Sequence, residues 1–133
     1  GRSTPGTHVS SIVSLRDLAS TILDLSNLKS HPPVPGTSLA SLWQGTKVDG
    51  SPAFAELAHG IRPDPSWPIA KGPMVSLVQG GFHYIRRGDG LEELYQLTPR
   101  DEELLDLRGR PDFGDTLAQM RSEIAQITKA MTK

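Results

Sequence analysis

The sequence feature that most restricts the possible folds of this chain is a set of three short β-prone runs separated by glycine-containing turns. The runs are residues 74–78, 82–86 and 94–97. Gly80-Gly81 lies between the first two runs, and Gly88-Asp89-Gly90 follows the second. Glycines there suit tight hairpin turns, which need positive φ. The three runs therefore predict an antiparallel meander.

The segments around the meander complete a small α+β unit. Residues 53–57 read as a further strand, and a proline-rich loop over residues 60–73 joins it to the meander. Residues 115–131 place apolar side chains on one helical stripe, at Leu117, Met120, Ile124, Ile127 and Met131. We expect a four-stranded antiparallel sheet with this C-terminal helix packed on one face.

The amino-terminal part reads as helical. Apolar residues recur at helical spacing over residues 14–25, and Ser14 with Asp17 three residues later resembles a capping box, which predicts a helix start at Ser14. The preceding residues 9–13 are β-prone and predict a short edge strand. A short helical turn over residues 39–43, closed by Gly45, is also expected.

Charge and composition exclude several classes of partner. Fourteen Lys and Arg stand against fifteen Asp and Glu, without a basic stretch, so nucleic acid is not an expected partner. No run approaches the roughly 20 apolar residues that cross a bilayer, so no membrane segment is expected in this chain. The absence of cysteine excludes a thiol nucleophile and a thiolate metal site. The start lacks an initiator Met and a signal-like apolar run, which suits a fragment and leaves the compartment undetermined.

No arrangement of residues predicts catalysis within this chain. The four histidines are scattered, with no pair at the i,i+4 spacing of a helical metal site. The acidic cluster of Glu92, Glu93 and residues 101–103 is expected at solvated turns, where carboxylates do not acquire the separated pKa values of an acid–base pair. No Gly-x-Ser-x-Gly motif is present. We therefore assign no catalytic or metal-binding residue.

Five segments, taken in order, resemble the motifs of one known protein family. Residues 13–25 read VSLRDLASTILDL, similar to V-S-x-x-D-L-x-P-T-I-L-D-L, with Ser20 in place of proline. Residues 35–45 resemble P-x-x-G-x-S-L-x-x-L-L-x-G, residues 54–56 a strand ending in Glu, and residues 78–85 the hairpin R-T-G-x-Y-K-Y-I.

The fifth segment, residues 93–107, contains further departures from the family pattern. Residues 93–97 are similar to E-L-Y-D-L, with Gln96 for Asp. Glu103 and Leu107 match D-P-x-E-x-x-N-L, in which Arg100-Asp101 replaces Asp-Pro and Asp106 replaces Asn. These changes concern turns, so they bear on the subfamily more than on the family.

This resemblance to arylsulfatase-like members of the alkaline phosphatase superfamily implies a division of the chain. Residues 1–46 would end the large α/β domain, and residues 47–133 would form the carboxy-terminal antiparallel-sheet subdomain. The family uses a formylglycine made in a C/S-x-P-S-R motif and a divalent cation, Ca or Mg. Neither that motif nor the family's metal ligands occur here, so the fragment alone is expected to be inactive and to contain no cofactor.

The resemblance also implies partners and a candidate contact with substrate. The partners would be the remainder of the sulfatase catalytic domain and, through the parent protein, a sulfated small molecule or glycan. The parent would be periplasmic, secreted or lysosomal. His59, Arg62 and Trp67 in the long loop are the substrate-cleft candidates, because an imidazole, a guanidinium and an indole suit an anionic sugar or aryl group. The alternative is that they are surface or inter-domain packing residues.

Two other functions remain open from the sequence. The parent could hydrolyse phosphonate or phosphate diesters, because this region does not separate the activities of the superfamily. The chain could instead be a stand-alone binding module. A module predicts no exposed apolar patch, whereas a fragment predicts that residues 9–25 dock on a missing domain and present apolar surface.

Overall fold

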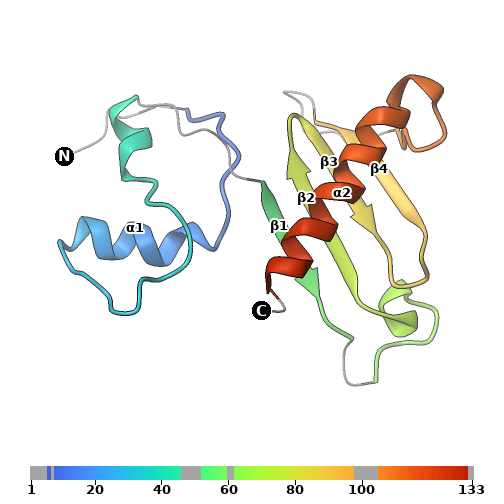
Figure 1. Cartoon of the computed structure of the whole chain (residues 1–133), viewed down its shortest axis with the longest axis horizontal. Helices are drawn as coiled ribbons and strands as arrows, with labels where there is room; N and C mark the ends of the chain where they lie inside the picture. The colour runs from blue at the N-terminus through green and yellow to red at the C-terminus, as the bar shows by residue number, and fades with distance from the viewer. Residues whose placement is uncertain (1–5, 7, 46–51, 60–61, 98–104, 132–133) are drawn as a thin grey trace. The chain divides into compact units, whose positions relative to one another are not determined.

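The described residues of the computed structural model are 6, 8–45, 52–59, 62–97 and 105–131. They belong to two compact units, residues 1–53 and residues 54–133 (Figure 1). The fold class is α+β, as expected. The second unit contains a four-stranded antiparallel sheet and a long C-terminal helix.

The four strands lie side by side in the sheet in the same order as in the sequence. They are β1 (Ala53–Leu57), β2 (Met74–Gln79), β3 (Phe82–Arg86) and β4 (Glu92–Gln96). The predicted meander is therefore confirmed, with β4 beginning two residues earlier than expected. The turn between β2 and β3 is made by Gly80 and Gly81, with φ of 58° and 81°. Residues with a side chain adopt such positive φ values only at a conformational cost, so glycine suits both positions.

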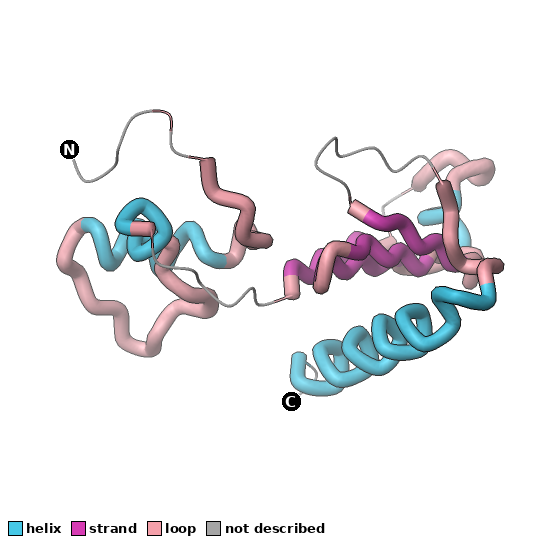
Figure 2. Tube along the Cα trace, turned by 90° about the horizontal axis from the view of Figure 1, so that it is seen from above, coloured by secondary structure: helices cyan, strands magenta, loops and turns pink. Residues whose placement is uncertain are grey.

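The register of the strands decides which side chains form the core. Leu77 lies opposite Tyr84, which in turn lies opposite Leu94, so the three side chains line up on one face. Helix α2 (Gly114–Met131) runs along that face (Figure 2). The buried core contains Val75, Leu77, Tyr84, Leu94, Leu107, Leu117, Met120 and Ile124. The expected stripe of α2 supplies the helical part of this core, although Met131 at its end is 59% exposed.

The outer edge of β4 is covered by the segment that leads to α2. The amide of Leu107 donates to the carbonyl of Leu94 at 2.7 Å. The amide of Leu94 in turn donates to Oδ1 of Asp106 at 3.1 Å. Asp106 thus satisfies a strand amide with its side chain, and the edge is less available for pairing with another chain. A 3-10 turn, η3 (Pro111–Phe113), then leads into α2.

Helix α1 (Asp17–Leu25) begins three residues later than predicted. Arg16, not Ser14, is at the N-cap position and provides no side-chain cap. Instead, Oδ2 of Asp17 accepts the Ser14 amide at 3.0 Å. That bond is the half of a capping box that reaches backwards, and it holds Ser14 in the turn before the helix. Residues 9–13 form no strand, since the structure gives them no strand partner among the described residues.

The segment after α1 is bound to a polar stripe of that helix. Oδ1 of Asp17 accepts the amide of Thr37 at 2.9 Å, and Oγ1 of Thr21 accepts the amide of Leu39 at 3.0 Å. Gly36 approaches the helix so closely that a Cβ there would lie 2.4 Å from the Arg16 carbonyl oxygen. The expected helical turn follows as η1 (Ala40–Gln44), closed by Gly45 at φ 77°.

Candidate functional site

The described part of the long loop between β1 and β2 is anchored by one buried side chain. The 3-10 turn η2 (Pro68–Lys71) lies within it, and its Ile69 is only 9% exposed. Nδ1 of His59 lies 2.9 Å from the carbonyl oxygen of Ile69. Because a carbonyl can only accept, Nδ1 carries the proton, and Nε2 is the nitrogen that a ligand would meet. His59 therefore links the beginning of the loop to its buried anchor.

A side-chain turn at Asp64 fixes the backbone before Trp67. Oδ1 of Asp64 accepts bonds from the Ser66 amide at 2.8 Å and the Ser66 hydroxyl at 2.7 Å. These two donors lower the pKa of the Asp64 carboxyl below its usual value. The Trp67 amide donates to the carbonyl of Asp64 at 2.9 Å. The chain thus enters η2 with the Trp67 indole 58% exposed.

The far end of the loop rests on the turn between β3 and β4. A Cβ on Gly88 would lie 2.1 Å from the carbonyl oxygen of Gly72, so the two backbones touch. Nζ of Lys71 lies 4.0 Å from Oδ2 of Asp89, which also pairs with Arg87 at 2.9 Å. The backbone contact between Gly72 and Gly88 fixes the end of the loop relative to the sheet. A side chain at position 88 would not leave room for this contact.

The three residues singled out as substrate-cleft candidates all lie in this loop and are exposed. Arg62 has a left-handed backbone with φ 58° and an exposed side chain. In the described part of the loop, no hydrogen bond, ion pair or ring contact joins His59, Arg62 and Trp67 to one another. The described part of the loop therefore carries a cation, an indole and an imidazole on one scaffold, with Nδ1 of His59 hydrogen-bonded to Ile69. The role of the three side chains in binding substrate stays a prediction.

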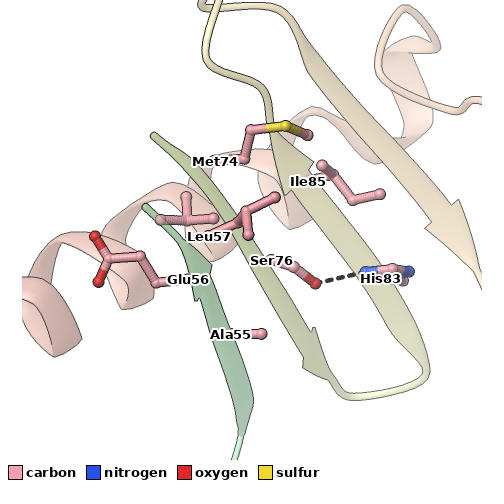
Figure 3. Close-up of a pocket in the computed structure, with 8 residues that line it drawn as sticks. Ala55, Glu56, Leu57, Met74, Ser76, His83 and Ile85 are labelled. Atoms are coloured by element: carbon pink, nitrogen blue, oxygen red, sulfur yellow. Dashed lines mark hydrogen bonds between the residues drawn. The ribbon is translucent and has the colours of Figure 1, made fainter. Parts of the chain in front are cut away.

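A hollow on the other face of the sheet was not anticipated. The hollow is an open depression of about 310 Å³. Figure 3 shows side chains that line it, on the sheet face opposite α2. Its lining is mainly apolar, with Ala55, Leu57, Met74 and Ile85 around a hydrogen bond of 2.7 Å between Oγ of Ser76 and Nε2 of His83. The alternation of side chains along each strand was the available signal. Met74 and Ser76 lie two residues apart in β2, as do His83 and Ile85 in β3, so each pair shares one face. The hollow contains no Lys or Arg to bind an anion, so it suits an apolar group better than a sulfate.

Glu92 corrects the expectation that the acidic cluster is solvated. Its side chain is 22% exposed and accepts hydrogen bonds from the Tyr84 hydroxyl at 2.6 Å and from Nε of Arg121 at 2.8 Å. The arginine lies in α2, far along the chain, so the pairing could not be seen in a local pattern. The pKa of Glu92 is lowered to about 2, chiefly by the Arg121 hydrogen bonds. This carboxylate is a permanent structural anion, unsuited to proton transfer at neutral pH. Residues 101–103 lie outside the described residues, as does Arg100.

The described residues do not fit the cofactors that the resemblance implies. They contain no group of three or more His, Asp or Glu side chains that could hold a metal ion. The sequence also contains no C/S-x-P-S-R motif to become formylglycine. No chemical step through a metal or an aldehyde hydrate can therefore be assigned to residues of this chain. Within the same described residues, no helix is long and apolar enough to cross a membrane.

Solved structures share this architecture. A phosphonate monoester hydrolase from Silicibacter pomeroyi matches 96% of the chain with a TM-score of 0.69 at 20% identity. A candidate sulfatase from Bacteroides thetaiotaomicron matches 86% with a TM-score of 0.66 at 21% identity. The chain has a sulfatase-like fold. A phosphonate monoester hydrolase from Agrobacterium radiobacter shares this fold. It matches 92% of the chain with a TM-score of 0.63 at 17% identity.

The chain is much shorter than these proteins. It spans 24%, 27% and 26% of the B. thetaiotaomicron, S. pomeroyi and A. radiobacter chains respectively. No protein-family model and no curated protein sequence matches it. The likeness is therefore one of fold, carried by strand order and helix placement more than by identical residues.

Proposed function

We propose that this chain is the carboxy-terminal part of a sulfatase-type ester hydrolase and supports its fold and substrate cleft without supplying catalytic residues. The observation that carries the proposal is the structural match to a candidate sulfatase and to a phosphonate monoester hydrolase. The match covers nearly the whole of this chain and about a quarter of the length of each of those two proteins. The parent would supply the formylglycine, the divalent cation and the remaining site.

In this proposal the long loop forms part of the cleft wall. Arg62 would face the negative charge of the ester, since a guanidinium offers fixed paired donors to a sulfate or phosphonate oxygen. Trp67, at 58% exposure, would stack on a sugar or aryl group. His59 would act mainly by positioning, because its Nδ1 is used to hold Ile69.

Phosphonate or phosphodiester hydrolysis is the second candidate, favoured by the two phosphonate monoester hydrolases among the similar structures. Sulfate and phosphonate esters both place anionic oxygens beside an organic group, and the loop residues suit either. A stand-alone binding module is a weaker candidate because apolar side chains of residues 9–25 are exposed, as a fragment predicts.

The test compares the 133-residue chain with the longer polypeptide proposed to contain it. Both are assayed with p-nitrophenyl sulfate and with a p-nitrophenyl phosphonate monoester. We expect hydrolysis of one ester by the longer polypeptide alone, with the preferred ester deciding between the two candidates. Hydrolysis by the 133-residue chain would reject its supporting role, and a longer polypeptide inactive on both esters would favour the binding module.

The cleft role of the loop has its own test in the longer polypeptide. Arg62→Ala and Trp67→Ala should each raise KM about tenfold, as expected for loss of a charged or stacking contact worth about 1.4 kcal/mol. Lys129→Ala removes a positive charge from an exposed position in α2 and serves as the control. Unchanged KM in both loop variants would identify Arg62 and Trp67 as surface or packing residues.

A further inference from the structure

The hollow on the sheet face opposite α2 is built by alternate residues of β2 and β3 (Figure 3). Val75 and Leu77 point into the core and are buried. Met74 and Ser76 alternate with them and point to the opposite face. Ser76 lies opposite Ile85 in the register, so these two side chains are neighbours in the hollow. Met74, Ser76 and Ile85 are only half-buried, which leaves them accessible to a ligand.

One polar pair interrupts this apolar surface. Oγ of Ser76 and Nε2 of His83 lie 2.7 Å apart. When Nε2 carries no proton, the serine hydroxyl donates to it and the serine oxygen can still accept a hydrogen bond. When Nε2 carries the proton, the serine oxygen accepts from it and the serine hydroxyl can still donate. In either tautomer Ser76 can therefore make one further hydrogen bond.

The charges in and beside the hollow disfavour an anionic ligand. Among the residues that line it, Glu56 is a carboxylate, and none is a Lys or Arg. Arg87, two positions after Ile85, is paired with Glu93 at 3.3 Å and with Asp89 at 2.9 Å. A sulfate or carboxylate would lose hydration here without gaining a cationic partner from the lining residues. An uncharged ligand avoids that cost.

The size of the hollow limits the ligand to a small one. Its volume of about 310 Å³ is at the lower end of the range for small-molecule sites, which suits a single substituted ring. Leu57, Met74 and Ile85 offer aliphatic and thioether groups, and both kinds pack well against an aromatic ring. The polar pair lies among them, so a ligand that packs its ring here can also reach Ser76 with one hydroxyl.

We propose that this hollow binds a small uncharged aryl alcohol. The ring packs on Leu57, Met74 and Ile85, and the hydroxyl forms a hydrogen bond with Oγ of Ser76. None of the three candidates in the long loop lines the hollow. The site is therefore additional to the proposed substrate cleft, and the proposal does not depend on the proposed function.

Titration of the isotope-labelled 133-residue chain with 4-ethylphenol, followed by NMR at neutral pH, tests the proposal. We expect a dissociation constant on the order of 1 mM for a ligand of this size. The largest chemical-shift changes should occur at the amides of Ala55, Ser76 and Ile85. Three related probes carry a similar ring: 4-ethylphenyl sulfate is an anion, 4-ethylbenzylammonium is a cation, and ethylbenzene lacks the hydroxyl. We expect the sulfate to bind at least about tenfold more weakly and ethylbenzene about fivefold more weakly.

Two variants locate the site. Ala55→Phe places a ring in the hollow from an exposed position of β1 and should weaken 4-ethylphenol binding at least about tenfold, because one ring replaces the other. Ala118→Phe, at an exposed position of α2, is the matched control and should leave the affinity unchanged. Ser76→Ala should weaken 4-ethylphenol binding about fivefold and abolish its advantage over ethylbenzene.

Several results would overturn the proposal. They are the absence of shift changes at these three amides, binding of the sulfate or the ammonium probe as tight as that of 4-ethylphenol, and an unchanged affinity in Ala55→Phe. An unchanged preference for 4-ethylphenol over ethylbenzene in Ser76→Ala would overturn the assigned hydrogen bond. Ser76→Ala only removes a hydroxyl, so it tests the site even where Ala55→Phe disturbs β1.

Discussion

Arg121 of α2 binds both carboxylate oxygens of Glu92 in β4, through Nε at 2.8 Å to Oε1 and through Nη2 to Oε2. The Tyr84 hydroxyl donates to Oε1 from the adjacent strand β3. One carboxylate therefore ties two strands to the helix that covers them. Because the pair lies at the rim of the core, it fixes where α2 crosses the sheet.

Acid should weaken the chain through Glu92. Its folded pKa of about 2 is below the ordinary 4.5, so its stabilisation is complete above pH 4.5 and is lost as the pH falls towards 2. Glu92→Gln should cost about 1–2 kcal/mol at pH 7, a value reduced by screening because the Arg121 side chain is 53% exposed. Urea unfolding at pH 7 and pH 3 measures this, and the variant should lose less stability between the two values than wild type. An equal loss in both proteins would show that Glu92 does not control this window.

Alkali should act through Tyr84, which is 1% exposed. Burial and the neighbouring Glu92 raise its pKa to about 12 from 10, so its contribution is complete below pH 10 and is lost as the pH rises towards 12. Tyr84→Phe removes one hydrogen bond, at a cost of about 1 kcal/mol at pH 7, and should flatten the stability profile between pH 10 and 12. Unfolding followed by circular dichroism across this range is the measurement. A variant that loses stability as steeply as wild type would contradict the assignment.

Gly88→Ala should loosen the long loop from the sheet. Its Cβ would lie 2.1 Å from the Gly72 carbonyl oxygen and 2.5 Å from that of Pro68, so the two backbones must separate, at a cost of about 1–3 kcal/mol. Gly109→Ala is the matched control, since a Cβ there meets nothing within 4 Å. Urea denaturation of both variants checks the difference. If Gly88→Ala were no more destabilising than the control, the loop would not be fixed by this contact.

Asp106 should tolerate Asn but not Ala. Ala leaves the Leu94 amide without its acceptor and should cost about 1–2 kcal/mol. Asn keeps Oδ1 and loses only the ion pair with Arg108, whose side chain is 45% exposed, so we expect a cost below about 0.5 kcal/mol. Hydrogen exchange of the Leu94 amide is the direct measurement and should quicken only in Asp106→Ala. Similar exchange in both variants would rule out the Asp106 side chain as its acceptor.

The meander and its covering helix were predictable because their signals are local. Two-residue alternation, the glycines at 80 and 81 and the apolar stripe of residues 115–131 each report a preference of neighbouring residues. The family resemblance predicts a fold, and the solved structures agree with that fold. The C-terminal position within a larger hydrolase stays a proposal. The position of Asp106 shows why a departure from the family pattern did not alter the fold, since Asp and Asn present the same acceptor oxygen.

Other features depended on residues that meet only in the folded chain. Sequence determined that α1 is amphipathic, but its start at Asp17 and its inner polar face arise because residues 35–39 bring unpaired backbone groups to that side. Glu92 looked like a solvated turn residue until Arg121, 29 positions away, was placed beside it. Periodicity along a chain reports which side chains share a face. Only tertiary structure decides what that face meets, because the partners of a hydrogen bond or an apolar stripe are chosen by long-range packing.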